Sequence, residues 1–417
     1  MRSAPRNNRP AWLVVALLPA LLADCKKDKA EPAAPGSPTT APSSGTPVTA
    51  DSGAGPDARA ATGADDEFAA APCWNGTDWV ARDAVGKPSG AADRCGRVGD
   101  RPFGETPLEL LGGRLTVRGP QGSRLLARPA DAVATPGTVE KETRVSWEEG
   151  NERFDLTAWE LFRSAGERPT SRVRAEVELR NAGSDIAWCV EPLPRAAGGL
   201  RAYALVPDRL SGDGSSLPVL SVLAVHPDGL VQELRWFVGP AQVSDAAGCI
   251  ALARRAAATL ATGPRRIPRE AGAQRLDAFS QTKQLEVLLP ADYVHTPQPD
   301  GDIAVHRIEP ILPLGEPGAS LSLYLGDNPA QPAEGWGGSI DRSKAPLLGE
   351  EVEWLAWFIP ENEGKPAEFH LEALRPLPDE MGFPHFLHVL ITAGDAGLRD
   401  ELRDAARSLR IVDHSER

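Results

Sequence analysis

Apolar and polar residues alternate with period two along many short segments after about residue 71. Residues 114–120 and 284–290 both follow the pattern Leu-x-Val-x-x-Pro and end at a proline, as short strands do. Residues 254–260 and 403–409 share the pattern Arg-x-Ala-Ala-x-Ser/Thr-Leu, and their apolar residues recur every three or four positions. The chain therefore contains two similar predicted strands and two similar predicted amphipathic helices.

These pairs occur in the same order, which predicts an internal duplication. Between them, residues 156–159 resemble 321–324, and residues 220–223 resemble 387–390. The last match need not join equivalent strands, because the first stretch has one more predicted strand, at 230–238, before its helix. We predict one domain copy at 113–262, a linker at 263–283 and a second copy at 284–413.

Each predicted helix has one apolar side, formed by Cys249, Ala253, Ala256 and Leu260 in the first copy. Such a side must pack on a sheet or on another helix. Residues 353–359 are apolar on both faces at period two, which predicts a strand covered on both sides. The expected fold class is α+β, with two tandem domains that each have an antiparallel sheet with helices packed on it.

This order of elements resembles the Mog/PsbP-like α/β/α sandwich family. The resemblance covers about residues 113–263 and 284–412, and it rests on the short strand and helix motifs given above. It implies a non-catalytic binding or scaffolding domain, and it supplies no catalytic residues.

The N-terminus has the features of an export signal. Three arginines, at positions 2, 6 and 9, precede an apolar run at 11–22, which is too short to span a bilayer. Residues 22–25 resemble a bacterial lipobox, although Asp24 departs from it, and they predict a signal peptide at 1–24 with lipidation of Cys25. Ordinary cleavage and secretion is the alternative.

Residues 25–70 are rich in Ala, Pro, Ser, Thr and Gly, and Phe68 is their one aromatic residue. Such a segment buries too little apolar surface to fold, so we predict a disordered tether. Residues 71–112 form a predicted N-terminal segment stapled by a disulfide. The net charge of −13 argues against nucleic acid as a partner and leaves the lipid anchor as the one expected membrane contact.

With Cys25 lipidated, four cysteines remain, which in an exported protein predicts two disulfides. Four cysteines allow three pairings. We expect Cys73 to pair with Cys95 and Cys189 with Cys249, because the apolar side of the first helix directs Cys249 inward.

The sequence has no motif of a serine hydrolase or of a zinc protease, so we assign no catalytic residue and no cofactor. His370 and Glu372 share a predicted strand face and could meet His388 as a zinc site, but ordinary polar positions explain them as well, so we assign no metal. The expected protein is a lipid-anchored component of the cell envelope, on the periplasmic side or the cell surface, or otherwise secreted. It binds or scaffolds an envelope protein or a small ligand. The alternative is an exported hydrolase with a site between the two domains.

Overall fold

A computed structural model describes residue 68 and residues 72–85, 102–126, 140–149, 152–194, 197–208, 218–238, 246–276, 283–300, 303–327, 329–362, 366–377 and 386–413. They belong to one compact unit at 59–417. The predicted signal peptide and Cys25 lie outside the described residues. Within the described ranges, no helix is long and apolar enough to cross a membrane.

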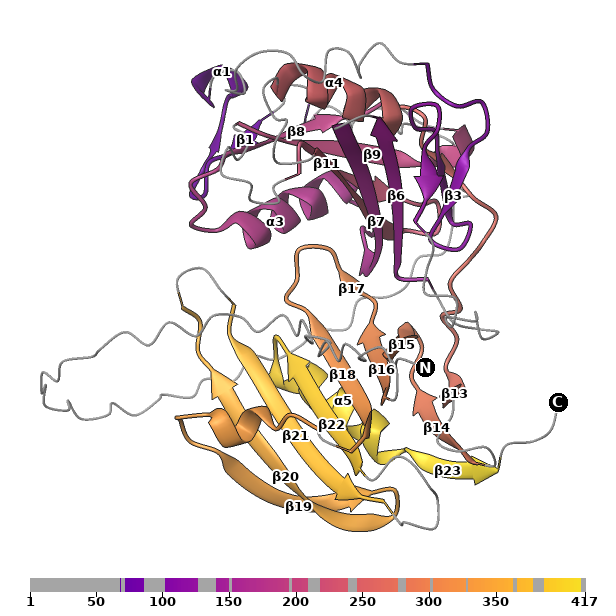
Figure 1. Cartoon of the computed structure of the whole chain (residues 1–417). Coiled ribbons are helices and arrows are strands. Elements are labelled where there is room, and N and C mark those ends of the chain that lie inside the picture. The colour runs from indigo at the N-terminus through magenta and orange to yellow at the C-terminus, as the bar shows by residue number, and fades with distance from the viewer. Residues whose placement is uncertain are drawn as a thin grey trace, which may run out of the picture. The chain divides into compact units, whose positions relative to one another are not determined.

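The larger of two main sheets has ten strands (Figure 1). Its order is β2-β1-β8-β9-β10-β11-β7-β6-β5, with antiparallel neighbours, and β17 pairs in parallel with the end of β7. The strands are β1 (Cys73–Trp74), β2 (Trp79–Val80), β5 (Arg124–Leu125), β6 (Glu142–Glu149), β7 (Glu152–Ser164), β8 (Trp188–Pro192), β9 (Arg201–Pro207), β10 (Leu220–Val225), β11 (Leu230–Val238) and β17 (Leu312–Pro313). The helices α1 (Arg82–Val85), α3 (Pro169–Asn181), η2 (Ala197–Gly199) and α4 (Ala246–Ala257) belong to the same part of the chain.

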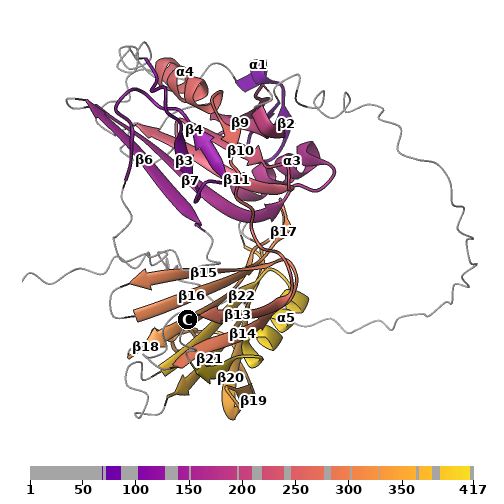
Figure 2. The same cartoon turned by 90° about the vertical axis from the view of Figure 1, so that its right-hand side faces the viewer.

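The second main sheet has seven antiparallel strands, in the order β15-β16-β18-β22-β21-β20-β19. They are β15 (Tyr293–Asp300), β16 (Ile303–Pro310), β18 (Ala319–Gly326), β19 (Asp341–Leu347), β20 (Glu350–Ile359), β21 (Glu368–Pro376) and β22 (Phe386–Ala393). This part also contains η4 (Pro332–Gly335) and α5 (Ala396–Arg407), and Figure 2 shows α5 along one side of the sheet.

Each main sheet is accompanied by a three-stranded sheet whose central strand carries the Leu-x-Val pattern. In the first, β4 (Leu115–Val117) lies between β3 (Leu108–Leu110) and β12 (Ala261–Thr262). In the second, β14 (Lys283–Leu289) lies between β13 (Gly272–Leu276) and β23 (Arg410–Asp413). β12 follows α4 and β23 follows α5, so the predicted opening strand meets the chain just after the predicted closing helix.

The two sets of strands correspond one to one in order. The order β5-β6-β7-β11-β10-β9-β8 in the larger sheet corresponds, position by position, to the order β15-β16-β18-β22-β21-β20-β19 in the second sheet. Leu156 of β7 lies opposite Trp236, and Leu321 of β18 lies opposite Ile391, so this sequence match falls on corresponding strands. The match of 220–223 with 387–390 does not, because it joins β10 to β22, whose counterpart is β11.

The ten-stranded sheet is buried on both faces, as the predicted sandwich requires. Ala204 and Val222 face a core that includes α4, β3 and β4. Tyr203 and Leu223 face the opposite way, into a core with Val173 and the rest of the buried side of α3. Figure 1 shows α4 and α3 on opposite sides of this sheet.

The seven-stranded sheet is covered by a helix on one face only within the described residues. Leu323 and Leu371 pack with Leu402 of α5 and with β14. We call the opposite side the open face; many of its side chains are half-exposed. The prediction that residues 353–359 are covered on both sides is therefore only partly right. On the open face of this strand Trp357 is buried, but Leu355 and Ile359 are only half-buried, because an apolar pattern does not specify what covers a strand.

Three predicted boundaries also change. Phe68, assigned to the tether, is buried and packs edge-to-face on Tyr203, with ring centroids 5.7 Å apart. Part of the segment at 71–112 joins the ten-stranded sheet as β1 and β2. The linker at 263–283 contains β13, which pairs with β14. These boundaries were predicted from local composition, whereas in the structure they depend on contacts with distant strands.

Candidate functional site

Strand β7 bulges near its end. Glu160 lies opposite Gln232 and Arg163 lies opposite Val231, so two residues of β7 have no partner position on β11. One of them, Phe162, is buried and has a φ of 52°, a left-handed conformation that is strained for a bulky residue. Bulges bend a strand and change the direction of its side chains. Beyond the bulge, Arg163 and Ser164 at the end of β7 pair with β11 on one side and with β17 on the other.

A cavity of about 260 Å³ lies between this bulge and the ends of several strands of the seven-stranded sheet. The bulge contributes Leu161, Phe162 and Arg163. The opposite wall comes from residues at or near the ends of β16, β17, β18, β21 and β22. Its polar and charged side chains are those of Arg307, Glu309, Ser320, Glu368 and Thr392.

Ionic contacts hold one wall of the cavity. Lys141 forms an ion pair with Glu309, and its ammonium nitrogen lies 5.4 Å from the centre of the Phe162 ring. Nε of Arg307 lies 3.4 Å from the other carboxylate oxygen of Glu309. Burial lowers the pKa of Lys141, and Glu309 partly opposes that shift. Glu309 is thus shared by two cations.

The guanidinium of Arg163, on the bulge side of the cavity, is not fully hydrogen-bonded. Its Nη1 atom is buried and has no hydrogen-bond partner in the described part of the chain. A Cβ atom on Gly318 would lie 3.3 Å from its Nη2, so glycine leaves room for the guanidinium. Burial lowers the pKa of Arg163, although Glu176 and Glu309 act in the opposite direction.

A row of polar side chains crosses the open face beside the cavity. The Thr392 hydroxyl lies 3.3 Å from Nδ1 of His370, and Nε2 of His370 lies 3.1 Å from a carboxylate oxygen of Glu368. The Trp357 ring stacks on His370, with centroids 4.9 Å apart. Burial lowers the pKa of His370, while Glu368 acts to raise it.

Two of the three candidate zinc ligands meet. Nε2 of His388 lies 2.7 Å from Oε1 of Glu372, and Oε2 of Glu372 accepts a hydrogen bond of 2.9 Å from the backbone N–H of Ala333. His370 lies on the same face but contacts Glu368 and Thr392 instead. The described residues contain no group of three His, Cys, Asp or Glu side chains placed to hold a metal ion. Glu372 and His388 therefore fasten η4 to the sheet.

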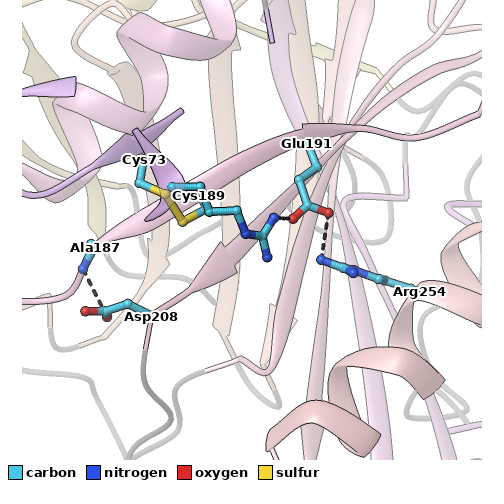
Figure 3. The surroundings of a disulfide bond; sticks show 7 residues. Cys73, Ala187, Cys189, Glu191, Asp208 and Arg254 are labelled. Atoms are coloured by element: carbon cyan, nitrogen blue, oxygen red, sulfur yellow. Dashed lines mark hydrogen bonds and ion pairs between the residues drawn. A yellow bond between two sulfur atoms is a disulfide. The ribbon is translucent and has the colours of Figure 1, made fainter. Parts of the chain in front are cut away.

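The predicted cysteine pairing is wrong. Cys73 forms a disulfide with Cys189, which lies directly opposite it on the neighbouring antiparallel strand (Figure 3). The Val190 N–H donates to the Pro72 carbonyl at 2.9 Å, so the cysteines occupy a non-hydrogen-bonded pair, where opposed side chains are closest. Cys95 and the side chain of Cys249 lie outside the described residues.

Charged contacts continue beside this bond. Glu191 forms ion pairs with Arg82 and, at 2.6 Å, with Arg254 of α4. The backbone N–H of Ala187 donates to Asp208 at 3.1 Å (Figure 3). The disulfide therefore lies in a well-connected part of the sheet and fastens its edge.

Comparison with known proteins gives few parallels. No protein-family model and no curated protein matches this chain. Among solved structures, the apo immunity protein TplEi of T6SS from Pseudomonas aeruginosa is 12% identical, with 75% of this chain and 98% of that chain covered and a TM-score of 0.18.

TplEi complexed with an "L" peptide is 13% identical, with 73% and 96% covered and a TM-score of 0.20. MucB in complex with MucA(peri) is 12% identical, with 76% and 96% covered and a TM-score of 0.15. Similarity at this level carries no argument about this chain, so the function is argued from the site.

Proposed function

We propose that this chain is an exported, lipid-anchored binding protein made of two copies of one Mog/PsbP-like domain, and that its binding site is the cavity beside the β7 bulge. The cavity carries the proposal, because the half-buried Arg163 follows a strained bulge, lines the cavity, and has a guanidinium nitrogen without a hydrogen-bond partner in the described residues. Small-ligand sites use a few convergent polar groups to fix the ligand, and Arg163, Arg307 and Glu368 converge on this cavity.

The correspondence of strand order supports the duplication. In each set, the Leu-x-Val strand pairs with the strand before it and with the strand after the closing helix. The registers also agree: Leu115 lies opposite Leu110, and Leu285 lies opposite Leu276. After duplication, one copy kept both faces buried and the other kept an open face for a ligand.

Export is supported by the buried disulfide and by the N-terminal pattern, since disulfides persist in oxidising compartments. Lipidation at Cys25 is tested directly. Cys25→Ser should move the protein from the membrane fraction to the soluble fraction or leave it unprocessed. A mature N-terminus after Cys25 without an acyl chain would leave secretion alone.

A cavity-filling substitution tests the binding role. The tagged full chain, extracted from membranes, should retain a bound molecule that mass spectrometry detects. Ser320→Trp should abolish this because Ser320 lines the cavity, whereas Ser343→Trp, on the exposed edge strand β19, should retain it. The same bound molecules in both variants would contradict a site at this cavity.

A hydrolase is the second candidate, and the row of Thr392, His370 and Glu368 favours it. A hydroxyl, an imidazole and a carboxylate in this order can form an activated nucleophile. If the row is catalytic, ester substrates should be cleaved by the wild type and not by Thr392→Val. If the wild type cleaves none of a broad set of esters, binding remains as the function.

A further inference from the structure

We infer that the cavity binds its ligand through a single carboxylate group, held by Arg163 and Arg307. This inference rests on the proposed binding function and names the chemistry of the ligand. A guanidinium presents several N–H donors in a plane, which suits the two oxygens of a carboxylate.

Arg163 supplies the main argument. A buried donor without a partner is rare in folded proteins, so the guanidinium of Arg163, which lines the cavity, still has an N–H group to offer a ligand that draws it outward. The neighbouring acids are already engaged. Glu176 pairs with Arg180 and accepts from Gly315 N–H at 2.8 Å, and Glu316 pairs with Arg172 at 3.2 Å.

The charge on the opposite wall favours a monoanion. Glu309 is shared by Lys141 and Arg307, and Nε of Arg307 is buried without a hydrogen bond. Two cations thus contact one carboxylate, and Arg163 is close enough for its pKa to be raised by the same carboxylate. Glu368, across the cavity, contacts His370 and would repel a second negative charge on the ligand. A carboxylate carries the one negative charge that the cations attract and lacks the second charge that Glu368 would repel, unlike a phosphate dianion.

Size and lining suggest the rest of the ligand. The volume of about 260 Å³ is below the roughly 300–1,000 Å³ of drug-sized pockets, so it fits one short group rather than a nucleotide. Leu161, Leu312 and Pro317 give apolar surface for a short aliphatic part. A free short-chain carboxylic acid and the C-terminal residue of a peptide share this chemistry.

Calorimetric titration of the purified full chain tests the inference with pentanoate, its neutral amide, inorganic phosphate, and the peptide Ala-Ala-Leu with a free or amidated C-terminus. We expect pentanoate or the free peptide to bind, and the matching amide to bind about tenfold more weakly or worse. Binding of the free peptide alone would identify a chain end as the source, whereas binding of pentanoate alone would identify a free acid.

Variants separate the site from general charge effects. Arg163→Gln and Arg307→Gln should each weaken binding by about tenfold or more, and Arg163→Lys should fall between the wild type and Arg163→Gln. Arg342→Gln is the matched control, because that arginine is exposed on β19 and pairs with Glu353. Melting curves of each variant establish that it is folded.

Equal affinity for acid and amide, tighter binding of phosphate, or full affinity in folded Arg163→Gln would each overturn the carboxylate. If none of the acids binds while Ser320→Trp still loses the co-purified molecule, the binding function stands and the ligand class is wrong. If Ser320→Trp loses nothing, the site itself is wrong.

Discussion

One strand position, at corresponding places in β11 and β22, holds different residues that bind different partners in the two sheets. Glu233 on β11 lies opposite Trp159, and His388 on β22 lies opposite Tyr324, so the two residues correspond. Glu233 bonds Arg180 of α3 at 2.6 Å. His388 bonds Glu372, which holds the start of η4. Each anchors the element that covers its face.

The two covering elements differ in length, and this decides what each face can do. The helix α3 has 13 residues and η4 has four. The longer element buries one face in an apolar core, whereas the shorter one leaves polar side chains and a cavity accessible. A binding surface can thus arise by shortening one covering element while the sheet beneath keeps its strand order.

The largest expected effect concerns whether the second set folds alone. A fragment of residues 268–417 should melt cooperatively, because it contains β13 to β23, α5 and their core. A fragment starting at 277 lacks β13, leaves one side of β14 unpaired, and should aggregate or lose cooperativity. Calorimetry of both fragments is the measurement. Identical behaviour would show that β13 is dispensable.

The next largest effect is expected from loss of the disulfide, which should destabilise one sheet and not the other. Cys73→Ser, or reduction, should destabilise the ten-stranded sheet by about 2–5 kcal/mol, because the bond closes a loop across 116 residues. Hydrogen exchange should show the loss there and little change in the seven-stranded sheet. Non-reducing peptide mapping should link Cys73 to Cys189; a Cys73–Cys95 peptide would contradict the structure.

The ten-stranded sheet has a buried acid at a position where the seven-stranded sheet has no titratable group. Glu160 contacts Arg114 at 2.8 Å and Gln232 at 3.0 Å, whereas the corresponding pair in the other sheet is Leu325 and Leu387. Burial raises the pKa of Glu160 to about 7, and Arg114 only partly opposes this.

The folded state therefore holds this proton more tightly than the unfolded state does. The stabilisation is complete below about pH 4.5, the ordinary pKa, and is lost as pH rises through about 7. The free energy of unfolding, measured by urea denaturation, should change between pH 5 and pH 8 by up to about 3 kcal/mol more in the wild type than in Glu160→Gln. An equal change of stability with pH in the wild type and in Glu160→Gln would show that Glu160 is not the group responsible.

The two anchors should differ in cost. Glu233→Ala leaves Arg180 short of a partner beneath α3 and should cost about 2–3 kcal/mol of global stability. Glu372→Ala should cost about 1–2 kcal/mol and act locally, by raising hydrogen exchange at Ala333. Denaturation and exchange measured together test this. A larger global loss for Glu372→Ala would reverse the comparison.

The smallest expected effect is at the exposed end of β20. Phe358→Ser should change stability by less than about 1 kcal/mol, because Phe358 is 46% exposed and loses mainly its contact with Phe369. Trp354→Ala, on the same strand, is the contrasting control and should cost about 3–5 kcal/mol. A comparable loss at both positions would show that the end of β20 is packed as tightly as its middle.

Local pattern explains what could be predicted from the sequence. The Leu-x-Val strands and the closing helices follow from period and breakers alone, and both lie where the pattern places them. The contact between Glu372 and His388 agrees with the strand pattern, because the two residues lie on one face of adjacent strands. The covering elements could not be predicted, since the pattern of a strand does not indicate whether a helix such as α3 or a short turn such as η4 lies over it.

The cavity and the disulfide depend on contacts between distant residues. Cys73 and Cys189 meet only because β1 joins the sheet beside β8. Arg163 and Arg307 come from different sheets, and neither stands in a recognisable motif. One local signal was available: Leu161 and Phe162 are consecutive apolar residues that break the alternation of β7, as a bulge does.

The cross-strand disulfide also has a mechanical consequence. After the contact of Phe68 with Tyr203, the chain enters the ten-stranded sheet through β1, so tension applied to the N-terminal residues passes into the strand pairing at that short strand. Without a covalent link, β1 could peel away one hydrogen bond at a time. With Cys73 joined to Cys189, the load passes to β8, an interior strand that is hydrogen-bonded on both sides. A pull on the N-terminal side of β1 is then carried by the whole sheet rather than by its edge.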